Sequence, residues 1–314
     1  MAKREPIKGK HVYGPLLSRR LGLSLGVDLV SYKTCDYDCI YCQLGRTAVK
    51  TAVRRPFDSP AIILDELKRK LDSIEEPDYI TISGSGEPTL NSDLGLIISE
   101  IKKMTGVPLA ILTNGSLLTD EDVTDACMLA DLVVPSLDAG DEETFKRVNR
   151  PAGGLTLGCI VDGMVSFRAK HPGQVWLEVM LVSGVNSDDA QIEKILDAAG
   201  RINPDLVQLN TVVRPPAETG ARPVDEETLA RIAALCGAKV EVVSSSRGSG
   251  AAIGMEADTE EILGLLARRP CTAGEISDAL SLHPTIAVKV LAELVGKGVL
   301  YLKSTDSGEY YHLT

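Results

Sequence analysis

The sequence predicts an α/β protein in which parallel strands alternate with helices, followed by a small second domain of helices and a hairpin. Short apolar runs alternate with segments of helical spacing over residues 1–243. A stretch rich in Ser, Gly and Ala at residues 244–257 then interrupts the alternation. Beyond it, at residues 258–314, helical segments come first and strands come last. We therefore predict a core, a linker and a second domain with these boundaries.

The core is predicted to consist of parallel βα units, six of which precede residue 237. The strands are predicted at residues 23–30, 78–83, 108–113, 131–137, 175–182, 205–212 and 239–244. The helices between them are predicted at residues 61–74, 93–104, 120–129, 141–148, 155–169, 188–202 and 225–236. Right-handed crossovers would wind these units into a doubly wound sheet or into a barrel-like arc. In both arrangements, loops at the carboxyl ends of the strands build the site.

The second domain is predicted to contain three helices and a hairpin. The helices are expected at residues 259–267, 272–280 and 283–298, and the strands at residues 299–304 and 309–314. Pro284 near the start of the third helix and Gly298 after it fit the usual start and stop signals. Three helices followed by a hairpin resemble a winged helix-turn-helix domain.

Composition and length are those of an ordinary globular protein, because 44% of the 314 residues are hydrophobic and 25% are charged. No apolar run approaches the roughly 18 residues of a membrane span. The first ten residues, MAKREPIKGK, are basic, and no apolar stretch follows them as it would in a secretory signal. We therefore expect a cytoplasmic protein without a membrane partner.

Charge is distributed unevenly along the chain. The net charge of −11 argues against a general nucleic-acid coat. Residues 1–55 nevertheless hold eleven Lys and Arg against four Asp and Glu, including the pairs Arg19–Arg20 and Arg54–Arg55. A basic patch of this kind could attract phosphate. Alternatively, these side chains neutralise acidic neighbours or bind a small anionic ligand.

The stretch YKTCDYDCIYC crowds three cysteines, Cys35, Cys39 and Cys42, into eight positions. Cysteine thiolates hold zinc or iron–sulfur clusters. Structural zinc needs four ligands, usually as two pairs, and the sequence contains no second Cys-x2-Cys. A zinc site would need a fourth ligand from a distant part of the sequence. A cluster held by three cysteines fits the spacing directly and leaves one iron with an open position.

The other four cysteines are scattered through apolar surroundings at Cys127, Cys159, Cys236 and Cys271. In a reducing compartment, a free cysteine behaves as a small hydrophobic residue. We therefore expect these four side chains to be buried without forming disulfides.

The cysteine stretch resembles the radical S-adenosylmethionine (SAM) superfamily. The resemblance rests on Cys-x3-Cys-x2-Cys, with Tyr41 just before the last cysteine, on a loop after the first predicted strand. It covers about residues 20–240 and implies a partial (β/α)6 barrel that is open on one side. It also implies that Cys35, Cys39 and Cys42 bind a [4Fe–4S] cluster whose fourth iron chelates the amino and carboxylate groups of SAM.

Further motifs extend the resemblance along the chain. The sequence SGSGEPTL is similar to the superfamily's Gly-Gly-Glu-Pro motif, which receives the SAM amino group, with Ser in place of the first Gly. The resemblance implies SAM contacts at Tyr41, Gly84, Ser85, Gly86, Glu87, Asn114, Ser136 and Asp138. Tyr41 would lie near the adenine, and the strands WLEVMLVSG and LVQLNTV would supply apolar packing. For Asp138 and Asp141, capping of the following helix is an equal alternative.

The chemistry that the resemblance implies belongs largely to the cofactors. The reduced cluster donates one electron to the sulfonium of SAM, which yields methionine and a 5′-deoxyadenosyl radical that abstracts hydrogen from a substrate. The protein must position three partners and exclude water and oxygen. An external one-electron donor of the flavodoxin or ferredoxin type is an expected partner.

The finer pattern resembles Fe–S oxidoreductases related to the wyosine-forming tRNA enzymes. It includes YGPLLSRRLGLSLGVDLVSYKTCDYDCIYCQLGRT and PSLDAGDEETFKRVNRP. This kinship implies a tRNA base as substrate, although no cysteine before Cys35 is present to bind the second cluster of the wyosine synthase. Radical modification or activation of a protein partner is the alternative.

A redox-sensing or SAM-sensing regulator that binds DNA through the second domain is a third hypothesis. Residues 258–314 hold five Lys and Arg against eight Asp and Glu, which disfavours binding to DNA phosphates.

Overall fold

The computed structural model describes residues 11–236, 239–243, 259–280, 282–305 and 308–314. The predicted linker at residues 244–257 and the first ten residues of the basic N-terminal segment lie outside the described residues. Within the described ranges, we find no helix with the length and apolar character needed to cross a membrane.

Among the described residues, eight strands form one sheet in the order β1-β2-β5-β6-β7-β8-β9-β10. Their bounds are Val12–Ser18 (β1), Gly22–Val27 (β2), Tyr79–Ile82 (β5), Leu109–Thr113 (β6), Leu132–Pro135 (β7), Gln174–Leu181 (β8), Leu206–Thr211 (β9) and Val240–Val242 (β10). Strands β2 to β10 pair in parallel, and β1 pairs with β2 in the antiparallel direction. The mostly parallel α/β architecture is therefore confirmed, and each of the seven predicted strands has its counterpart in this sheet.

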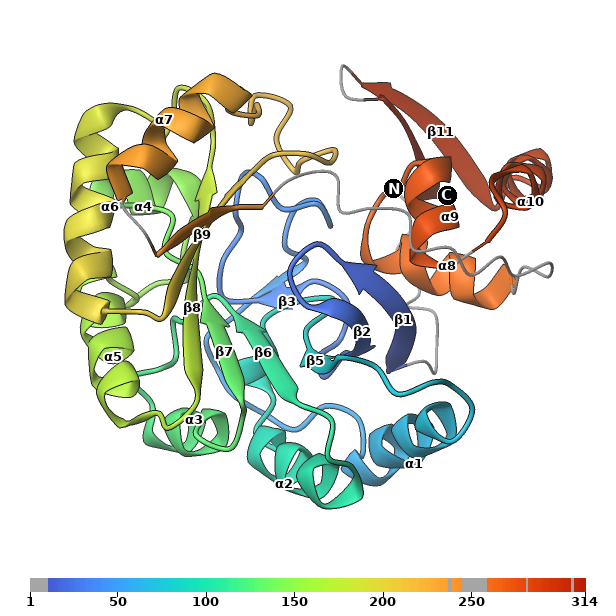
Figure 1. Ribbon diagram of the computed structural model, residues 1–314, viewed down its shortest axis with the longest axis horizontal. Coiled ribbons are helices and arrows are strands. Elements are labelled where there is room, and N and C mark those ends of the chain that lie inside the picture. Colours follow the sequence, from blue (N-terminus) through green and yellow to red (C-terminus); the bar gives the residue numbers. More distant parts are fainter. Residues whose placement is uncertain (1–10, 237–238, 244–258, 281, 306–307) are drawn as a thin grey trace.

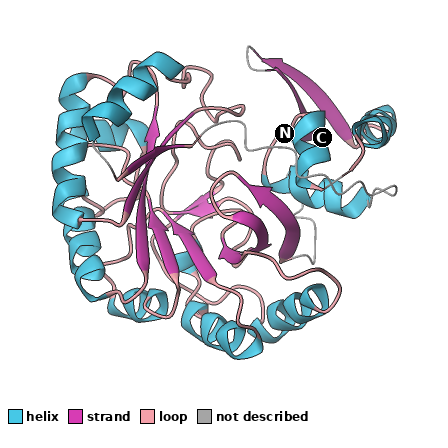
Figure 2. Cartoon of the chain, in the orientation of Figure 1, coloured by secondary structure: helices cyan, strands magenta, loops and turns pink. Residues whose placement is uncertain are grey.

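The helices between the parallel strands lie along the convex face of the curved sheet (Figures 1 and 2). Their bounds are Pro60–Leu71 (α1), Leu94–Met104 (α2), Glu121–Cys127 (α3), Glu142–Val148 (α4), Leu157–Lys170 (α5), Asp189–Ile202 (α6) and Glu226–Cys236 (α7). A doubly wound sheet would carry helices on both faces and reverse its strand order. The sequential order observed here excludes that alternative and leaves the barrel-like arc.

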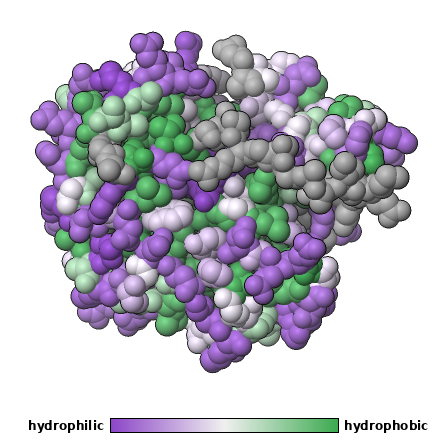
Figure 3. Space-filling view, in the orientation of Figure 1, coloured by the Kyte–Doolittle hydropathy of each residue, from purple (hydrophilic) through white to green (hydrophobic). Residues whose placement is uncertain are grey.

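Local sequence explains where several of these helices begin. The side chains of Asp120, Asp141, Thr156 and Asp188 each accept a hydrogen bond from a backbone N–H in the first turn of the following helix. Such caps satisfy donors that have no partner within the helix. The apolar faces of the helices then pack on a continuous core of Ile, Leu and Val side chains from the sheet. In the space-filling view, most side chains along the outline of the molecule are hydrophilic (Figure 3).

Strand β1 is the one strand of this sheet that the sequence did not predict. Its sequence, VYGPLLS, contains Gly14 and Pro15, which weaken a strand signal. Proline is tolerated here because β1 lies at the edge of the sheet, where one side of the strand needs no ladder partner. Two further two-residue strands, Thr34–Cys35 (β3) and Val49–Lys50 (β4), pair within the loop that follows β2.

The C-terminal segment, from α8 to β12, contains three helices and a hairpin, as predicted. Its elements are Thr259–Arg268 (α8), Ala273–Ala279 (α9), Pro284–Gly296 (α10), Leu300–Thr305 (β11) and Gly308–Leu313 (β12). The segment has a hydrophobic core of its own, against which Leu16 of β1 packs. The Tyr310 hydroxyl also donates to the carbonyl oxygen of Val213 at 2.7 Å. These contacts place the segment beside β1 and the chain that follows β9 (Figure 1).

The scattered cysteines differ from one another in burial. Cys127 and Cys271 are buried and without disulfides, as expected. Cys159 is exposed, so the expectation of burial was wrong for this residue. It lies on α5, where the first turn carries it to the outer surface. The side chain of Cys236 lies outside the description.

Candidate functional site

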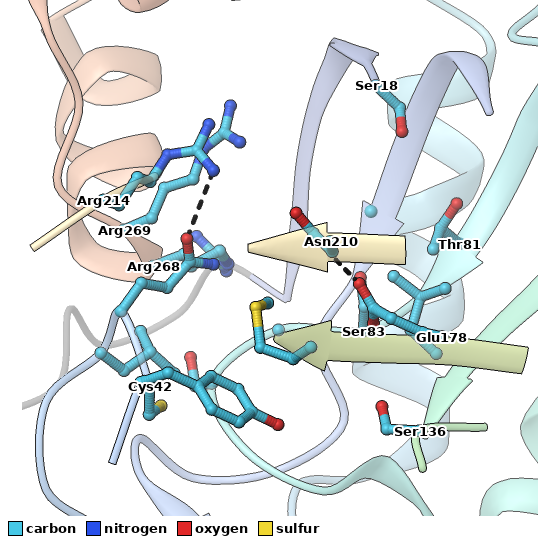
Figure 4. Close-up of a pocket in the computed structure, with 18 of the residues that line it drawn as sticks. Ser18, Cys42, Thr81, Ser83, Ser136, Glu178, Asn210, Arg214, Arg268 and Arg269 are labelled. Atoms are coloured by element: carbon cyan, nitrogen blue, oxygen red, sulfur yellow. Dashed lines mark hydrogen bonds between the residues drawn. The ribbon is translucent and has the colours of Figure 1, made fainter. Parts of the chain in front are cut away.

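A cavity of about 420 Å³ lies at the carboxyl ends of the parallel strands, where the loops of an α/β arc build a site. The three clustered cysteines line it, together with residues that follow β5 and β7 and residues of β8 and β9. Its wall also includes side chains of β1, of the β1–β2 turn and of α8. Figure 4 shows ten of these residues by name, including Cys42, Ser136, Glu178 and Asn210.

The cysteine loop follows β2 and is held by backbone hydrogen bonds to the loop after β5. Lys33 N–H donates to the Ser85 carbonyl oxygen at 2.6 Å, and Glu87 N–H donates to the Thr34 carbonyl oxygen at 3.1 Å. This approach requires glycine at position 86, since a Cβ atom there would lie 1.8 Å from the Thr34 carbonyl oxygen. The two motifs that the sequence singled out are therefore in direct contact.

The donor set fits an iron–sulfur cluster better than a single metal ion. Among the described residues, no three His, Cys, Asp or Glu side chains converge on one ion position. A zinc ion needs such convergence, with thiolate sulfurs at about 2.3 Å from the metal. Cys35, Cys39 and Cys42 border one shared cavity. Cysteine thiolates are the usual ligands of iron–sulfur clusters.

Amide groups lie beside two of the thiols. Asn149 Nδ2 is 3.5 Å from Cys39 Sγ, and Asn114 Nδ2 is 3.8 Å from Cys35 Sγ. Burial raises the pKa of all three thiols in the protein without metal. Hydrogen bonds to ligand sulfurs are one means by which a protein tunes the potential of a cluster. Asn114 was a predicted SAM contact, but it does not line the cavity, and its amide also donates to Asp36 Oδ1 at 2.5 Å.

The Gly84–Ser85–Gly86 turn, a predicted SAM-binding motif, lines the cavity. Asp28 holds the turn in place, because its Oδ2 accepts hydrogen bonds from Ser85 N at 3.0 Å and from Ser85 Oγ at 2.5 Å. Gly84 has a φ of 150°, and a Cβ atom there would lie 2.3 Å from Asp28 Cγ. The glycine thus permits both the backbone conformation and the close approach of the carboxylate.

Glu87 is placed differently from the sequence prediction, because its carboxylate does not line the cavity. Its Oε1 accepts from Thr89 N at 3.1 Å, Thr89 Oγ1 at 2.7 Å and Thr113 Oγ1 at 2.6 Å, and its Oε2 accepts from Asn114 N at 2.7 Å. Burial and the nearby Asp36 carboxylate raise the pKa of Glu87 to about 7, against the effect of these donors. Glu87 therefore joins the loop after β5 to the end of β6.

Asp138 has a similar bracing position behind the cavity wall. Its Oδ2 accepts from the Tyr41 hydroxyl at 2.5 Å and from Asn149 Nδ2 at 2.7 Å, and its Oδ1 accepts from Met180 N at 2.9 Å. Burial raises its pKa to about 6. Of the two capping alternatives, Asp141 caps α4 and Asp138 does not. Tyr41 and Ser136, two of the predicted SAM contacts, line the cavity.

Two polar residues of the cavity wall were missed by the sequence analysis, which expected only apolar packing from β8 and β9. Glu178 Oε1 accepts from Asn210 Nδ2 at 3.0 Å and pairs with Arg20 Nη1 at 2.8 Å (Figure 4 shows the first of these contacts). Burial acts to raise the pKa of Glu178, but Arg20 and Asn210 together lower it below the ordinary value. The signal was a carboxylate within the otherwise apolar run VWLEVMLV. The expected apolar wall is present as well, at Met180 and Val212.

The basic N-terminal segment divides into two parts. Arg54 Nη1 lies 3.4 Å from Asp120 Oδ1 and 3.5 Å from Asp122 Oδ2, which is the expected neutralisation of acidic neighbours. Arg55 stacks over the Phe57 ring. Arg19 and Arg20 instead line the cavity.

The chain is similar over almost its whole length to proteins from distant microbes. It is 32% identical to a UPF0026 protein of Methanocaldococcus jannaschii, covering 95% of this chain and 94% of that protein. It is 37% identical over 94% of its length to a protein named GTPase Obg of Brachyspira hyodysenteriae, but it spans only 44% of that protein. The chain contains no Gly-x4-Gly-Lys-Ser/Thr sequence of the kind that binds nucleotide phosphates in P-loop enzymes.

Other similarities concern shorter regions or the fold alone. A S-adenosyl-L-methionine-dependent tRNA 4-demethylwyosine synthase of Pyrococcus abyssi is 30% identical over 37% of this chain and 40% of its own length. A radical SAM methyltransferase of Sphaerobacter thermophilus superposes with a TM-score of 0.55 at 17% identity, covering 70% of this chain and 65% of that one.

Residues 29–199 match the family model described as the Radical SAM superfamily. This range begins just after β2, includes the cysteine loop and the Gly84–Gly86 turn, and extends to α6. The match covers more than half of the chain. The chain therefore belongs to the radical SAM superfamily of enzymes, whose cofactors are a [4Fe–4S] cluster and S-adenosylmethionine.

Proposed function

We propose that Cys35, Cys39 and Cys42 hold the [4Fe–4S] cluster and that SAM binds beside them in the cavity. The observation that supports this most directly is the contact between the cysteine loop and the Gly84–Gly86 turn, which brings both predicted motifs to one cavity wall. When bound, the cluster and SAM supply reductive cleavage of the sulfonium and, with it, a 5′-deoxyadenosyl radical that abstracts hydrogen from a substrate. An external one-electron donor of the flavodoxin or ferredoxin type completes the system.

In this proposal, the protein's own residues bind and orient the SAM molecule. The backbone of Gly84, Ser85 and Gly86 faces the cavity and offers polar groups to the SAM amino group. Ser136 and Tyr41 line the cavity and would contact the nucleoside part. Glu178 is the ionised carboxylate in the wall, and carboxylates form strong charge-assisted hydrogen bonds with hydroxyl and ammonium donors. Glu87, Asn114 and Asp138 act through the loops that they brace.

The experiment that tests the proposal is SAM cleavage by anaerobically reconstituted protein with dithionite. Wild-type protein should yield 5′-deoxyadenosine and bind iron and sulfide, and Cys39→Ala should do neither. Cys159→Ala is the matched control, because Cys159 is exposed and lies on α5 outside the cavity wall. Full turnover by Cys39→Ala, or stoichiometric zinc in place of iron, would show that the cluster assignment is wrong.

The organisation that we propose is a partial (β/α)6 barrel within residues 1–243 and a winged-helix-like domain within residues 258–314. The sequential sheet order and the helices on its convex face support the first part. The order of three helices and a hairpin, with a separate hydrophobic core, supports the second part.

For the substrate, we propose a tRNA base as the first candidate. Its support is the similarity to the Pyrococcus abyssi synthase over 37% of the chain. A protein partner is the second candidate, because the C-terminal segment exposes the apolar side chains of Val288, Val295, Val299, Tyr301 and Leu302. Filter binding of bulk tRNA at moderate salt distinguishes the two, since the tRNA hypothesis requires retention and the protein hypothesis does not.

A further inference from the structure

Arginines from three separate parts of the chain gather in the wall of the cavity. Arg19 and Arg20 come from the turn between β1 and β2, Arg214 follows β9, and Arg268 and Arg269 come from the end of α8. Figure 4 shows Arg214, Arg268 and Arg269 together, on the side of the cavity away from Ser136. The described lining residues include Lys33 as well, and Glu178 is the one carboxylate among them. This concentration of positive charge occurs in a chain whose net charge is −11.

The carboxylates of the protein neutralise this cluster only in part. Glu178 pairs with Arg20 at 2.8 Å, and Glu275 Oε1 accepts from Arg214 Nη2 at 2.6 Å. Asp28 Oδ2 lies 3.6 Å from Arg268 Nε, and the guanidinium of Arg268 also stacks over a tyrosine ring. Among the described residues, Arg19 and Arg269 form no ion pair, although the Glu178 carboxylate also acts on the charge of Arg19 from a longer distance.

Buried donors in the cluster have no partner. The Arg214 side chain is only 7% exposed, yet its Nε has no hydrogen-bond acceptor among the described residues. The same holds, in the described part of the chain, for Arg19 Nη1 and Arg269 Nε. A buried donor without an acceptor costs free energy, and a charged one costs more. The side chains of Arg19, Arg214 and Arg269 all line the cavity, so an anion entering it would bring acceptor oxygens close to their guanidinium groups.

Mutual repulsion supports the same conclusion. Burial and the neighbouring guanidinium groups of Arg214, Arg20 and Arg269 lower the pKa of Arg19 to about 10. Burial and the charge of Arg269 likewise lower the pKa of Arg214. An arrangement in which arginines destabilise one another's charged form becomes favourable when a multiply charged anion lies between them.

We propose that Arg19, Arg214 and Arg269 bind a phosphate group of the substrate and thereby hold a phosphate ester next to the cysteine loop. This inference rests on the proposed function and names the substrate class of that site. The oxygens of one phosphate group can accept hydrogen bonds from several guanidinium groups at once, which a single carboxylate cannot do. The carboxylate of SAM would pair with one arginine and leave the other arginines of the cavity wall without an anionic partner.

The C-terminal segment acquires a defined role in this proposal, because it supplies Arg269 and the adjoining Arg268. The segment also contacts the residues that hold the Gly84–Gly86 turn. Arg268 lies near Asp28, and Asp28 accepts hydrogen bonds from Ser85 in that turn. The segment therefore forms part of the substrate pocket and not a separate DNA-binding module. The phosphate ester can be a free nucleotide or a nucleotide within an RNA, and the experiment distinguishes these sources.

The test measures binding to the reconstituted holoenzyme with SAM present. The probes are inorganic phosphate, a mixture of nucleoside 5′-monophosphates and bulk tRNA, with acetate and unphosphorylated nucleosides as comparison ligands. We expect Arg269→Gln to weaken binding of the phosphate-bearing probe about tenfold or more, because one of the charged partners of the phosphate is lost. Arg19→Gln, on a different element, should do the same. Arg231→Gln is the matched control, since Arg231 is half-exposed on α7 and pairs with Asp189.

Arginine-dependent binding of monophosphates supports a small phosphorylated substrate, and arginine-dependent binding of tRNA alone supports an RNA nucleotide. The proposal is overturned if no phosphate-bearing probe binds, if acetate competes equally, or if both variants bind like wild type. Thermal unfolding of each variant separates loss of binding from loss of fold. SAM cleavage by the wild-type protein is measured in parallel. If the protein cleaves SAM but binds no phosphate, only the arginine site is refuted. If it binds phosphate but does not cleave SAM, only the proposed function is refuted.

Discussion

The Tyr41 hydroxyl donates to Asp138 Oδ2 at 2.5 Å, across 97 positions of sequence, and so joins the cysteine loop to the end of β7. The residue that precedes the last cysteine is therefore held by the loop after β7, a strand that β5 and β6 separate from β2 in the sheet. Asn149 and Met180 complete the set of donors to the same carboxylate. The geometry of the cysteine loop consequently depends on the packing of β7, β8 and α4 as well as on its own sequence.

Removing this hydroxyl should destabilise the protein. Tyr41→Phe keeps the ring but takes one donor from a buried carboxylate, which should lower the free energy of unfolding by about 1.5–3 kcal/mol at neutral pH. Urea unfolding of the protein without cofactors measures the change. Tyr301→Phe is the control, because this side chain is 45% exposed and should change stability by less than about 0.5 kcal/mol. Equal midpoints for the two variants would contradict the bracing role.

The contact between Gly86 and the cysteine loop can be tested by adding one methyl group. Gly86→Ala would place Cβ 1.8 Å from the Thr34 carbonyl oxygen, so the two loops must separate. We expect a loss of stability of about 1–3 kcal/mol or more and a matching loss of bound iron. Gly106→Ala should have neither effect, since nothing lies within 4 Å of its Cβ position. Normal iron content in Gly86→Ala would refute the proposed coupling of the loops.

Glu87→Gln distinguishes bracing from direct contact with SAM. The Glu87 carboxylate accepts four hydrogen bonds, and in the variant the side-chain NH2 group would face at least one of these donors. The free energy of unfolding, measured without SAM, should therefore fall by about 1–3 kcal/mol. Glu193→Gln, on the exposed surface of α6, is the matched control. Unchanged stability in Glu87→Gln, combined with weaker SAM binding, would instead place the carboxylate on the SAM amino group.

Acid sensitivity should come in part from His171, far from the cavity. Its ring is buried, stacks on Phe167 at 4.8 Å and has no hydrogen-bond partner at either nitrogen among the described residues. Burial and Arg168 lower the pKa of His171, while Asp205 and Asp131 act in the opposite direction. The folded protein therefore takes up a proton at lower pH than the unfolded chain does.

The stability that neutral His171 provides is thus fully present above the unfolded pKa of about 6.5 and is lost as the pH falls from there toward the folded pKa. The slope from this single proton cannot exceed about 1.4 kcal/mol per pH unit. Unfolding free energies between pH 7.5 and pH 5 should show a shallower slope for His171→Gln than for wild type. Identical slopes for the two proteins would contradict the assignment.

The sequence predicted those features that depend on local patterns. Alternating apolar runs and helical spacing predicted the parallel arc, and the motifs at Cys35–Cys42 and Gly84–Gly86 predicted two parts of the cavity wall. Strand β1 was missed because Gly14 and Pro15 break its pattern. Arg214 and Arg269 could not have been placed from sequence, because they lie far apart in the chain and meet only when the C-terminal segment packs beside β1. Glu87 and Asp138 were predicted to contact SAM from their motifs alone, whereas the donors that surround their buried carboxylates come from distant parts of the chain.

The cavity wall extends in sequence from Tyr13 to Arg269, so its two cationic sides are made at very different times. A ribosome adds about 5–20 residues per second, so on the order of ten seconds or more separate the synthesis of Cys42 from that of Arg269. During that interval, the nascent chain already has its three thiols but lacks α8. The cysteine loop is therefore synthesised well before the arginines near the end of α8 that complete the cavity wall.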